Sequence, residues 1–291
     1  MAQVKNMNFH KNIIIILLVF CLKNYAQIKP GAKQISLSHS DVALANDVYS
    51  LFNNPAGLSQ QNWREFSIYY SPSPFGLNKL ANSSAAYHEP TEFGSFAFAY
   101  SNYGFDLYKE NNIFVSYSNN VLSHFFFGAT IAYRNLSIKN YGSDNSLTIL
   151  LGGLVYLNNN LRIGFAIDNI TNSTVGKSDN QIPMILNLGL SYTLLSKLVI
   201  NTAIEKEIEK NASLHIGIDY EVIRYLNLRI GAMNEPSSFS AGIGINYSIF
   251  EIDYALFNHQ DLGFTHQFGI TLQFGGDKTR NERIQKYLSE N

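Results

Sequence analysis

The stretch "THQFGITLQFGG", residues 265–276, interleaves two kinds of side chain. From Phe268 to Phe274 every second residue is apolar, and the residues between them are glycine, threonine or glutamine. Because successive side chains of a β-strand point to opposite faces, this stretch predicts a strand with one apolar and one polar face. The fold then depends on whether the apolar face contacts a protein core or lipid.

The same alternation recurs from Trp63 to Phe274, and no helical period competes with it. Most of the predicted strands are long enough to cross a bilayer at a tilt, which takes about 9–11 residues, whereas strands of globular proteins average about five or six. The pattern predicts about fourteen strands, at 63–71, 81–88, 93–103, 110–118, 124–138, 147–157, 160–169, 184–193, 196–206, 211–220, 224–233, 238–247, 250–257 and 264–274.

Short and long connections alternate between these strands. The link at 158–160 is tight, whereas those at 139–146 and 170–183 are long. Membrane barrels have short periplasmic turns and longer outer loops, so an even strand number predicts that both termini lie in the periplasm.

Every strand offers an apolar face, and no predicted helix or second sheet is available to cover it. Lipid is the simplest partner. We therefore predict an all-β fold, a transmembrane antiparallel β-barrel over residues 61–275, crossing the outer membrane of a Gram-negative bacterium many times. A soluble β-sandwich is the alternative.

Composition agrees with this fold class. Charged residues make up 15% and aromatic residues 13% of the 291 residues. The mean hydropathy of -0.06 excludes a helical membrane bundle but not a barrel with a polar lumen. A net charge of -1 gives no field that would attract nucleic acid, and we expect no nucleic-acid partner.

The first 26 residues read as an export signal. Basic residues precede an apolar run at 13–21, and Ala26 places a small residue before the predicted cleavage site. A lipoprotein signal around Cys21 is the alternative. Cys21 is the only cysteine, so the mature chain from Gln27 onward cannot form a disulfide.

Two segments lie outside the predicted barrel. About fourteen tilted strands enclose a lumen wider than their side chains fill, since about eight strands already give a filled interior. Residues 27–60 are the only segment large enough to occupy that space as a plug; a surface turn without a plugging role is the alternative. Residues 276–291 are highly charged and are expected to form a periplasmic tail, either a short amphipathic helix around Ile284, Tyr287 and Leu288 or a frayed end.

Residues 31–32, 45–47 and 54–58, which read Gly-Ala, Ala-Asn-Asp and Asn-Pro-Ala-Gly-Leu, give the 27–60 segment a resemblance to a known family. It resembles the N-terminal signature of the PorV/PorQ branch of the FadL-like superfamily of outer-membrane barrels, and 253–266 is similar to that family's last hairpin. Ser38 and His39 depart from the pattern, because the family usually has two glycines there. The matching positions are Gly31, Ala32, Ala45, Asn46, Asp47, Asn54, Pro55, Ala56, Gly57 and Leu58.

The resemblance implies a fourteen-stranded barrel with a plug, and three functions follow from it. The first is an accessory role in type IX-like protein secretion, with secreted proteins or components of the secretion machine as partners. The second is a FadL-like channel for a small hydrophobic ligand, and the third is a structural barrel. Within the signature, residues 54–57 fit a turn in which Pro55 fixes φ and Gly57 takes a positive φ.

Charged side chains are expected on the lumenal face. This polar lining weighs against hydrophobic uptake, although Val42, Leu44, Val48 and Leu51 could build a local apolar pocket. Asp41 and Asp47 are expected to reach some of the lumenal arginines. The candidates are Arg134, Arg162, Asp168, His215, Asp219, Arg229, Glu251 and Asp253.

The sequence shows no catalytic set. The histidines have no metal-ligand spacing, and residues 242–244 and 275–279 lack a complete nucleotide-binding motif. His266 lies on the lipid face without a serine obviously beside it. We therefore expect neither an enzyme nor a cofactor or metal.

Overall fold

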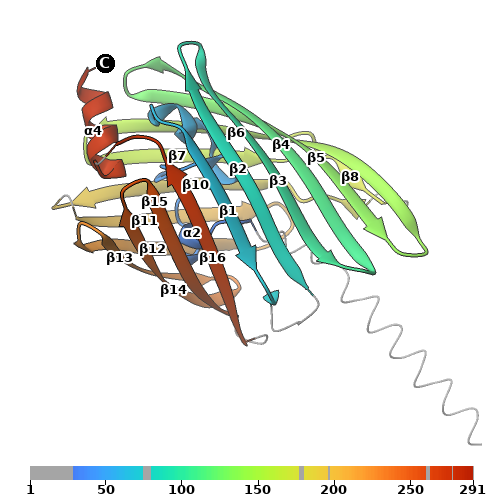
Figure 1. Ribbon diagram of the computed structural model, residues 1–291. Helices are drawn as coiled ribbons and strands as arrows, with labels where there is room; N and C mark the ends of the chain where they lie inside the picture. Colours follow the sequence, from blue (N-terminus) through green and yellow to red (C-terminus); the bar gives the residue numbers. More distant parts are fainter. Residues whose placement is uncertain are drawn as a thin grey trace, which may run out of the picture.

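The structure is a computed structural model, and it describes residues 29–74, 80–176, 180–195, 197–259, 263–276 and 278–290 (Figure 1). The predicted export signal lies outside these residues. No described helix is both long enough and apolar enough to span a membrane.

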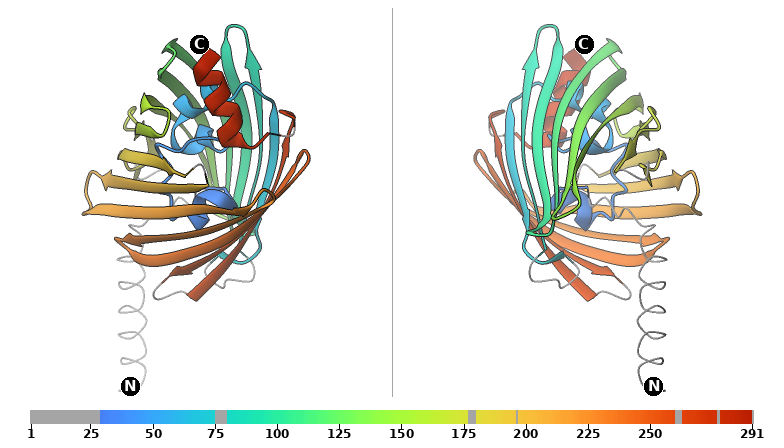
Figure 2. Two further views of the ribbon diagram at one scale, coloured as in Figure 1. Left: turned by 90° about the vertical axis from the view of Figure 1, so that its left-hand side faces the viewer. Right: turned by 90° about the vertical axis from the view of Figure 1, so that its right-hand side faces the viewer.

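Fourteen antiparallel strands form a closed barrel (Figures 1 and 2). Each strand pairs with the next strand of the barrel along the chain, and β1 closes the ring against β16, with Ser67 opposite Thr271. This confirms the predicted fold class. The strands are β1 (Glu65–Ser71), β2 (Ala81–Thr91), β3 (Gly94–Phe105), β4 (Tyr108–Leu122), β5 (Phe125–Ile138), β6 (Gly142–Asn158), β7 (Leu161–Asp168), β10 (Ile185–Leu194), β11 (Leu198–Glu207), β12 (Ala212–Ile223), β13 (Leu226–Asn234), β14 (Ser237–Tyr247), β15 (Phe250–His259) and β16 (Gly263–Gln273).

The barrel wall is uneven in height. β6 has 17 residues but β7 only 8, and the long connection after β7 carries a small separate sheet of β8 (Thr174–Val175) and β9 (Asn180–Gln181). β4 and β6 extend beyond their predicted bounds because polar pairs continue the ladder where apolar alternation ends. One example is the hydrogen bond from Asn135 Nδ2 to Asn145 Oδ1, at 2.7 Å.

The two faces of each strand differ as predicted. On β16, Phe268 and Ile270 are 47% and 51% exposed on the outer surface, whereas Gln267 and Thr271 are buried inside. The other strands show the same alternation. Among the described residues, no helix or second sheet covers the outer face.

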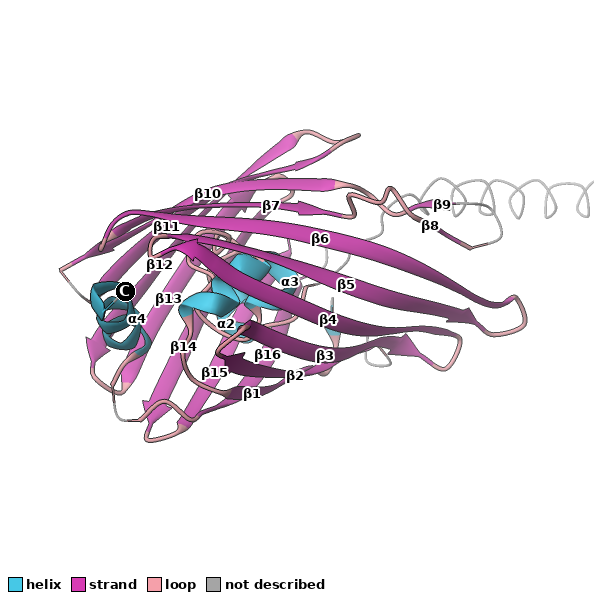
Figure 3. Ribbon diagram, turned by 90° about the horizontal axis from the view of Figure 1, so that it is seen from above, coloured by secondary structure: helices cyan, strands magenta, loops and turns pink. Residues whose placement is uncertain are grey.

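Residues 30–61 lie inside the barrel, and we call this segment the plug from its position (Figure 3). All of its residues except His39 are buried. It contains two short helices, α2 (Ala32–Ser36) and α3 (Ser50–Asn53), and a 3-10 helix, η2 (Pro55–Gln60), that leads toward β1.

The described chain begins and ends at opposite ends of the barrel. The Nζ atom of Lys29 lies 3.8 Å from Oδ2 of Asp168, where β7 enters its long connection. The C-terminal helix α4 (Arg280–Glu290) lies at the short-turn end, where Gln285 donates to the carbonyl of Asn159. The described part of the plug therefore starts at the end opposite α4, and the periplasmic position of both termini stays a prediction.

Candidate functional site

The wall carries glycines where the plug passes closest. A Cβ atom on Gly128 would lie 2.6 Å from the carbonyl carbon of Pro55, and one on Gly164 would lie 2.3 Å from the carbonyl oxygen of Val42. Real side chains do not approach so closely, so these glycines let the plug backbone lie directly on the wall.

Asn54 connects the plug to itself and to the wall. Its Nδ2 donates to the carbonyls of Val42 at 2.7 Å and of Gly153 at 3.0 Å. Its Oδ1 accepts from the backbone N–H of Ala56 at 3.2 Å, which caps η2, and Pro55 occupies the first turn. Residues 54–57 thus start a 3-10 helix rather than forming the predicted simple turn.

Gly57 is required for space rather than for its backbone angle. Its φ is not positive, contrary to the prediction, but a Cβ there would lie 2.0 Å from the carbonyl oxygen of Ala45. Ala45 itself has a φ of 37°. The next residue, Leu58, is fully buried. Close crossing of two plug segments therefore explains this glycine.

Asn46 and Asp47 hold the plug together through Lys33. The Lys33 ammonium donates to Asn46 Oδ1 at 2.6 Å and lies 3.0 Å from Asp47 Oδ2, which also accepts from Gln34 Nε2 at 2.8 Å. Asp41 accepts from Asn53 Nδ2 at 3.0 Å. These partners replace the lumenal arginines that Asp41 and Asp47 were predicted to reach.

Ser38 and His39 occupy the left-handed backbone region, with φ of 50° and 54°. Glycine adopts this region without steric cost. The structure therefore explains why two glycines suit these positions in the family that the segment resembles.

Four of the predicted lumenal residues come together on β12, β13 and β15. The Arg229 guanidinium lies 3.1 Å from Asp219 Oδ2 and 3.5 Å from Glu251 Oε1, and it also donates to Asp253. All four side chains are buried. One arginine and three carboxylates therefore form an ion-pair network on the lumenal face of the wall.

The other four predicted residues lie apart. Arg134 Nε donates to Thr148 at 3.0 Å, and Arg162 Nη1 donates to the Tyr156 hydroxyl at 2.7 Å. His215 Nδ1 lies 2.6 Å from the carbonyl oxygen of Ser38. Asp168 faces Lys29 as described above, so the eight candidates form one network and four separate contacts.

A second polar network was not predicted, and it joins all three parts of the molecule. Arg280 of α4 contacts Glu65 on β1, lies 2.6 Å from Glu251 Oε2 on β15 and donates to the carbonyl oxygen of Asn46 in the plug at 3.1 Å. Burial alone lowers the pKa of Arg280, but Glu251 and Glu65 outweigh this and raise it above its usual range. Arg280 therefore remains charged.

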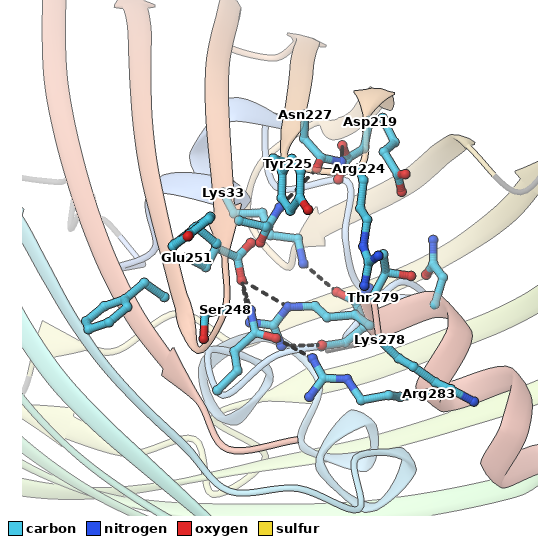
Figure 4. A pocket seen from close by; sticks show the side chains of 18 of the residues that line it. Lys33, Asp219, Arg224, Tyr225, Asn227, Ser248, Glu251, Lys278, Thr279 and Arg283 are labelled. Atoms are coloured by element: carbon cyan, nitrogen blue, oxygen red, sulfur yellow. Dashed lines mark hydrogen bonds and ion pairs between the residues drawn. The ribbon is translucent and has the colours of Figure 1, made fainter. Parts of the chain in front are cut away.

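The second network borders a cavity of about 380 Å³ at the short-turn end (Figure 4). Lys33 of the plug, Glu251 of the wall and Arg283 of α4 point into the same space in this view. Burial and the neighbouring Arg280 lower the pKa of Arg283 to about 10. The cavity is polar and does not suit an apolar solute.

The plug and the wall also share an apolar cluster, which lies among buried polar side chains of the same strands, such as Ser67, Ser84 and Ser116. Plug residues pack there against small side chains of β2, β3 and β5, and Phe52 meets Phe114 edge to face, with ring centroids 4.8 Å apart. We call this group the plug–wall apolar cluster. Its members are Ala32, Ile35, Val48, Tyr49, Leu51, Phe52, Leu58, Tyr69, Ala86, Ala97, Ala99, Phe114, Ala132 and Ala255.

The predicted apolar plug residues divide between this cluster and two smaller ones. Val48 and Leu51 belong to the plug–wall apolar cluster, Val42 packs near Leu150, and Leu44 packs near Val199. A small cavity of about 50 Å³ lies toward the long-connection end, and Phe52 and Phe114 line it together with polar and charged side chains that include Lys29, Arg134 and Asp168. The main apolar cluster therefore reaches a cavity at that end.

Comparison with solved structures finds barrels of the same architecture. A FadL homologue of Pseudomonas aeruginosa matches with a TM-score of 0.60 and 11% identity over 84% of this chain and 98% of that chain. The toluene transporter TbuX of Ralstonia pickettii matches with a TM-score of 0.57 and 13% identity over 78% of this chain and 93% of that chain. The monoaromatic hydrocarbon channel CymD matches with a TM-score of 0.58 and 11% identity over 86% of this chain and 98% of that chain.

These matches establish the fold class and no more, because their sequence identity is low. No protein-family model and no curated protein sequence matches the chain. The three similar structures carry the names of a FadL homologue, a transporter and a channel, and none is named as an enzyme or as a secretion component. Membership of the PorV/PorQ branch therefore stays a prediction.

Proposed function

We propose that this protein is an outer-membrane channel for small hydrophobic molecules. The plug–wall apolar cluster is the observation that carries the proposal. A channel for polar solutes is lined by polar groups, whereas a site for an apolar ligand needs mainly apolar and aromatic side chains with few polar ones. This cluster supplies such a lining between the plug and β1 to β5.

The outer surface supports the membrane location. Ile230 and Leu188 are 57% and 55% exposed on the apolar outer face. A band of such side chains around a closed barrel is stable in lipid and unfavourable in water. The predicted export signal and the architecture shared with the transporters named above are consistent with this location.

Passage requires the plug to shift. An apolar cavity of roughly 150 Å³ holds one benzene molecule. The cavity beside Phe52 and Phe114 is about 50 Å³, which is too small. The lumenal face of β3 carries Ala97 and Ala99 between Ser95 and Ser101, so displacement of the plug side chains would leave a path whose middle section is apolar.

Uptake of radiolabelled toluene tests the proposal in host cells that lack a hydrocarbon channel of their own. Cells producing the protein should accumulate toluene faster than cells with an empty vector. Ala99→Phe should reduce this uptake several-fold, because the larger side chain fills the apolar path. Ala241→Phe, the same change on the exposed outer face of β14, should leave it unchanged. Equal uptake with and without the protein would refute the channel.

An accessory role in protein secretion was the main expectation from the resemblance. Among the described residues we find no feature that favours it over the channel, so it stays a prediction. Co-purification of secreted proteins with the barrel would be the observation to support it.

A further inference from the structure

The C-terminal helix α4 lies at the short-turn end of the lumen, against Trp63 and the part of the wall formed by β5 and β6. Ile284 and Leu288 are buried against Trp63, Phe126 and other apolar residues of the wall. The Arg283 guanidinium stacks over the Trp63 ring, 4.0 Å from its centroid. The tail is therefore docked by apolar and cation–π contacts.

Arg280 ties this helix to the plug through shared partners. Glu65 accepts from Trp63 Nε1 at 2.6 Å and from the backbone N–H of Val48 at 2.9 Å, and it also contacts Arg280. Arg280 donates in addition to the carbonyl oxygen of Asn46. Residues 46–48 of the plug are thus held from both sides, by the wall and by α4.

A cavity that adjoins the start of the helix already opens to solvent, since Tyr225 and Tyr247 in its lining are 49% and 69% exposed. The 380 Å³ cavity lies between the plug, β12 to β16 and the segment 278–283, so it ends at the start of α4 (Figure 4). Undocking of α4 would remove the part of this cavity's wall that residues 278–283 form. It would also remove Arg280, the ion-pair partner of the buried Glu65, and a buried carboxylate that loses its partner destabilises the surrounding contacts.

We propose that α4 is a gate that acts by keeping the plug seated through Arg280. Release of the helix frees residues 46–48, so that the plug can shift and water at the short-turn end gains a path beside it. This inference deepens the proposed function and rests on it for its purpose, but its test uses no hydrophobic substrate.

The test compares the full mature barrel with an Arg280→Gln variant in planar bilayers. The variant should conduct ions several-fold better than the parent. Trp63 is the only tryptophan, so its fluorescence reports the docking of α4; its emission should shift to longer wavelength and be quenched more strongly by acrylamide. Lys210→Gln, which breaks the exposed pair with Glu207 (2.9 Å), should change neither property.

A cross-link provides the converse test. The mature chain is predicted to lack cysteine, so Asn159→Cys and Gln285→Cys can be joined by a reversible thiol cross-linker without competing sites. In the Arg280→Gln background the cross-link should return conductance to the parental value, and reduction should raise it again.

If Arg280→Gln fails to fold, a variant that ends at Gly276 can replace it in the conductance and fluorescence measurements, because this variant keeps every barrel strand. The gate would be refuted if a folded variant had an exposed Trp63 but the same conductance as the parent. It would also be refuted if both variants kept the fluorescence and the conductance of the parent. Raised conductance without any toluene uptake would support the gate while refuting the hydrophobic channel.

Discussion

Ile243 and Asn246 lie on opposite faces of β14, and this difference predicts opposite tolerance for charge. Ile243 is 43% exposed on the outer face, whereas Asn246 lies on the lumenal face and donates to Asn227 Oδ1 at 3.1 Å. Ile243→Arg should destabilise the barrel by about 2–4 kcal/mol near the bilayer midplane. Asn246→Arg should cause a much smaller loss, as measured by denaturant unfolding in lipid vesicles.

Gly217 shows why not every lumenal position can serve as the control. A Cβ there would lie 2.3 Å from Ser40 Oγ of the plug, so arginine at this position would disturb the packing regardless of its charge. Equal losses for Ile243→Arg and Asn246→Arg would contradict the assignment of the two faces.

Asp41 predicts a pH dependence of plug docking. Burial, followed by the nearby Asp47 carboxylate, raises the pKa of Asp41 from 3.8 to about 6; Asn53 and Lys33 oppose the shift. A raised pKa means that the docked plug favours the protonated form. This contribution, at most roughly 3 kcal/mol, is complete below about pH 4 and is lost as the pH rises through 6.

Protease cleavage of the plug measures this effect. Cleavage should be slower at pH 5 than at pH 7.5, and Asp41→Asn should reduce the difference. If the variant kept the full pH dependence of the parent, another group would be responsible.

At the scale of elements, the plug can be removed without breaking the wall. Deletion of residues 31–52 leaves every strand with both neighbours, because the ladder closes through β1 and β16 alone. The deletion variant should insert and show higher ion conductance in planar bilayers and higher sensitivity of cells to large antibiotics. A variant that inserts normally but conducts no better than the parent would show that these residues do not block the lumen.

The strands could be predicted from sequence because one apolar face repeats with a period of two residues, as in β14. The docking of α4 could not. Ile284 and Leu288 indicated an amphipathic helix, but the partners of Arg280 are Glu65 and Glu251, which are distant in the chain and belong to different strands. Without those partners, the charges of the tail predict a segment that is exposed to solvent.

The plug shows the same limit at single residues. The motif at 54–58 was recognised by resemblance, yet Gly57 is explained only by its contact with Ala45, which no local pattern encodes. The ion pairs of Asp47 were misassigned for a similar reason. Strand alternation predicts which arginines face the lumen, whereas Lys33 lies in a short helix whose sequence has no clear period and so does not predict where its side chain points.

For the whole molecule, a closed fourteen-stranded barrel predicts unusual resistance to detergent. The mature protein should fractionate with the outer membrane and migrate differently on a gel before and after heating, because the unheated barrel stays compact. A soluble band without any heat-dependent shift would contradict the membrane location.

The position of the plug has a consequence for how the chain assembles. The plug precedes every strand in sequence, it starts beside Asp168 at one end of the barrel, and its exit into β1 lies beside β16, the last strand. Fourteen strands therefore surround a segment that left the ribosome before any of them. We expect the wall to be laid around this segment, with the β1–β16 seam closing last, so that the N-terminal residues act as the core on which the barrel is built.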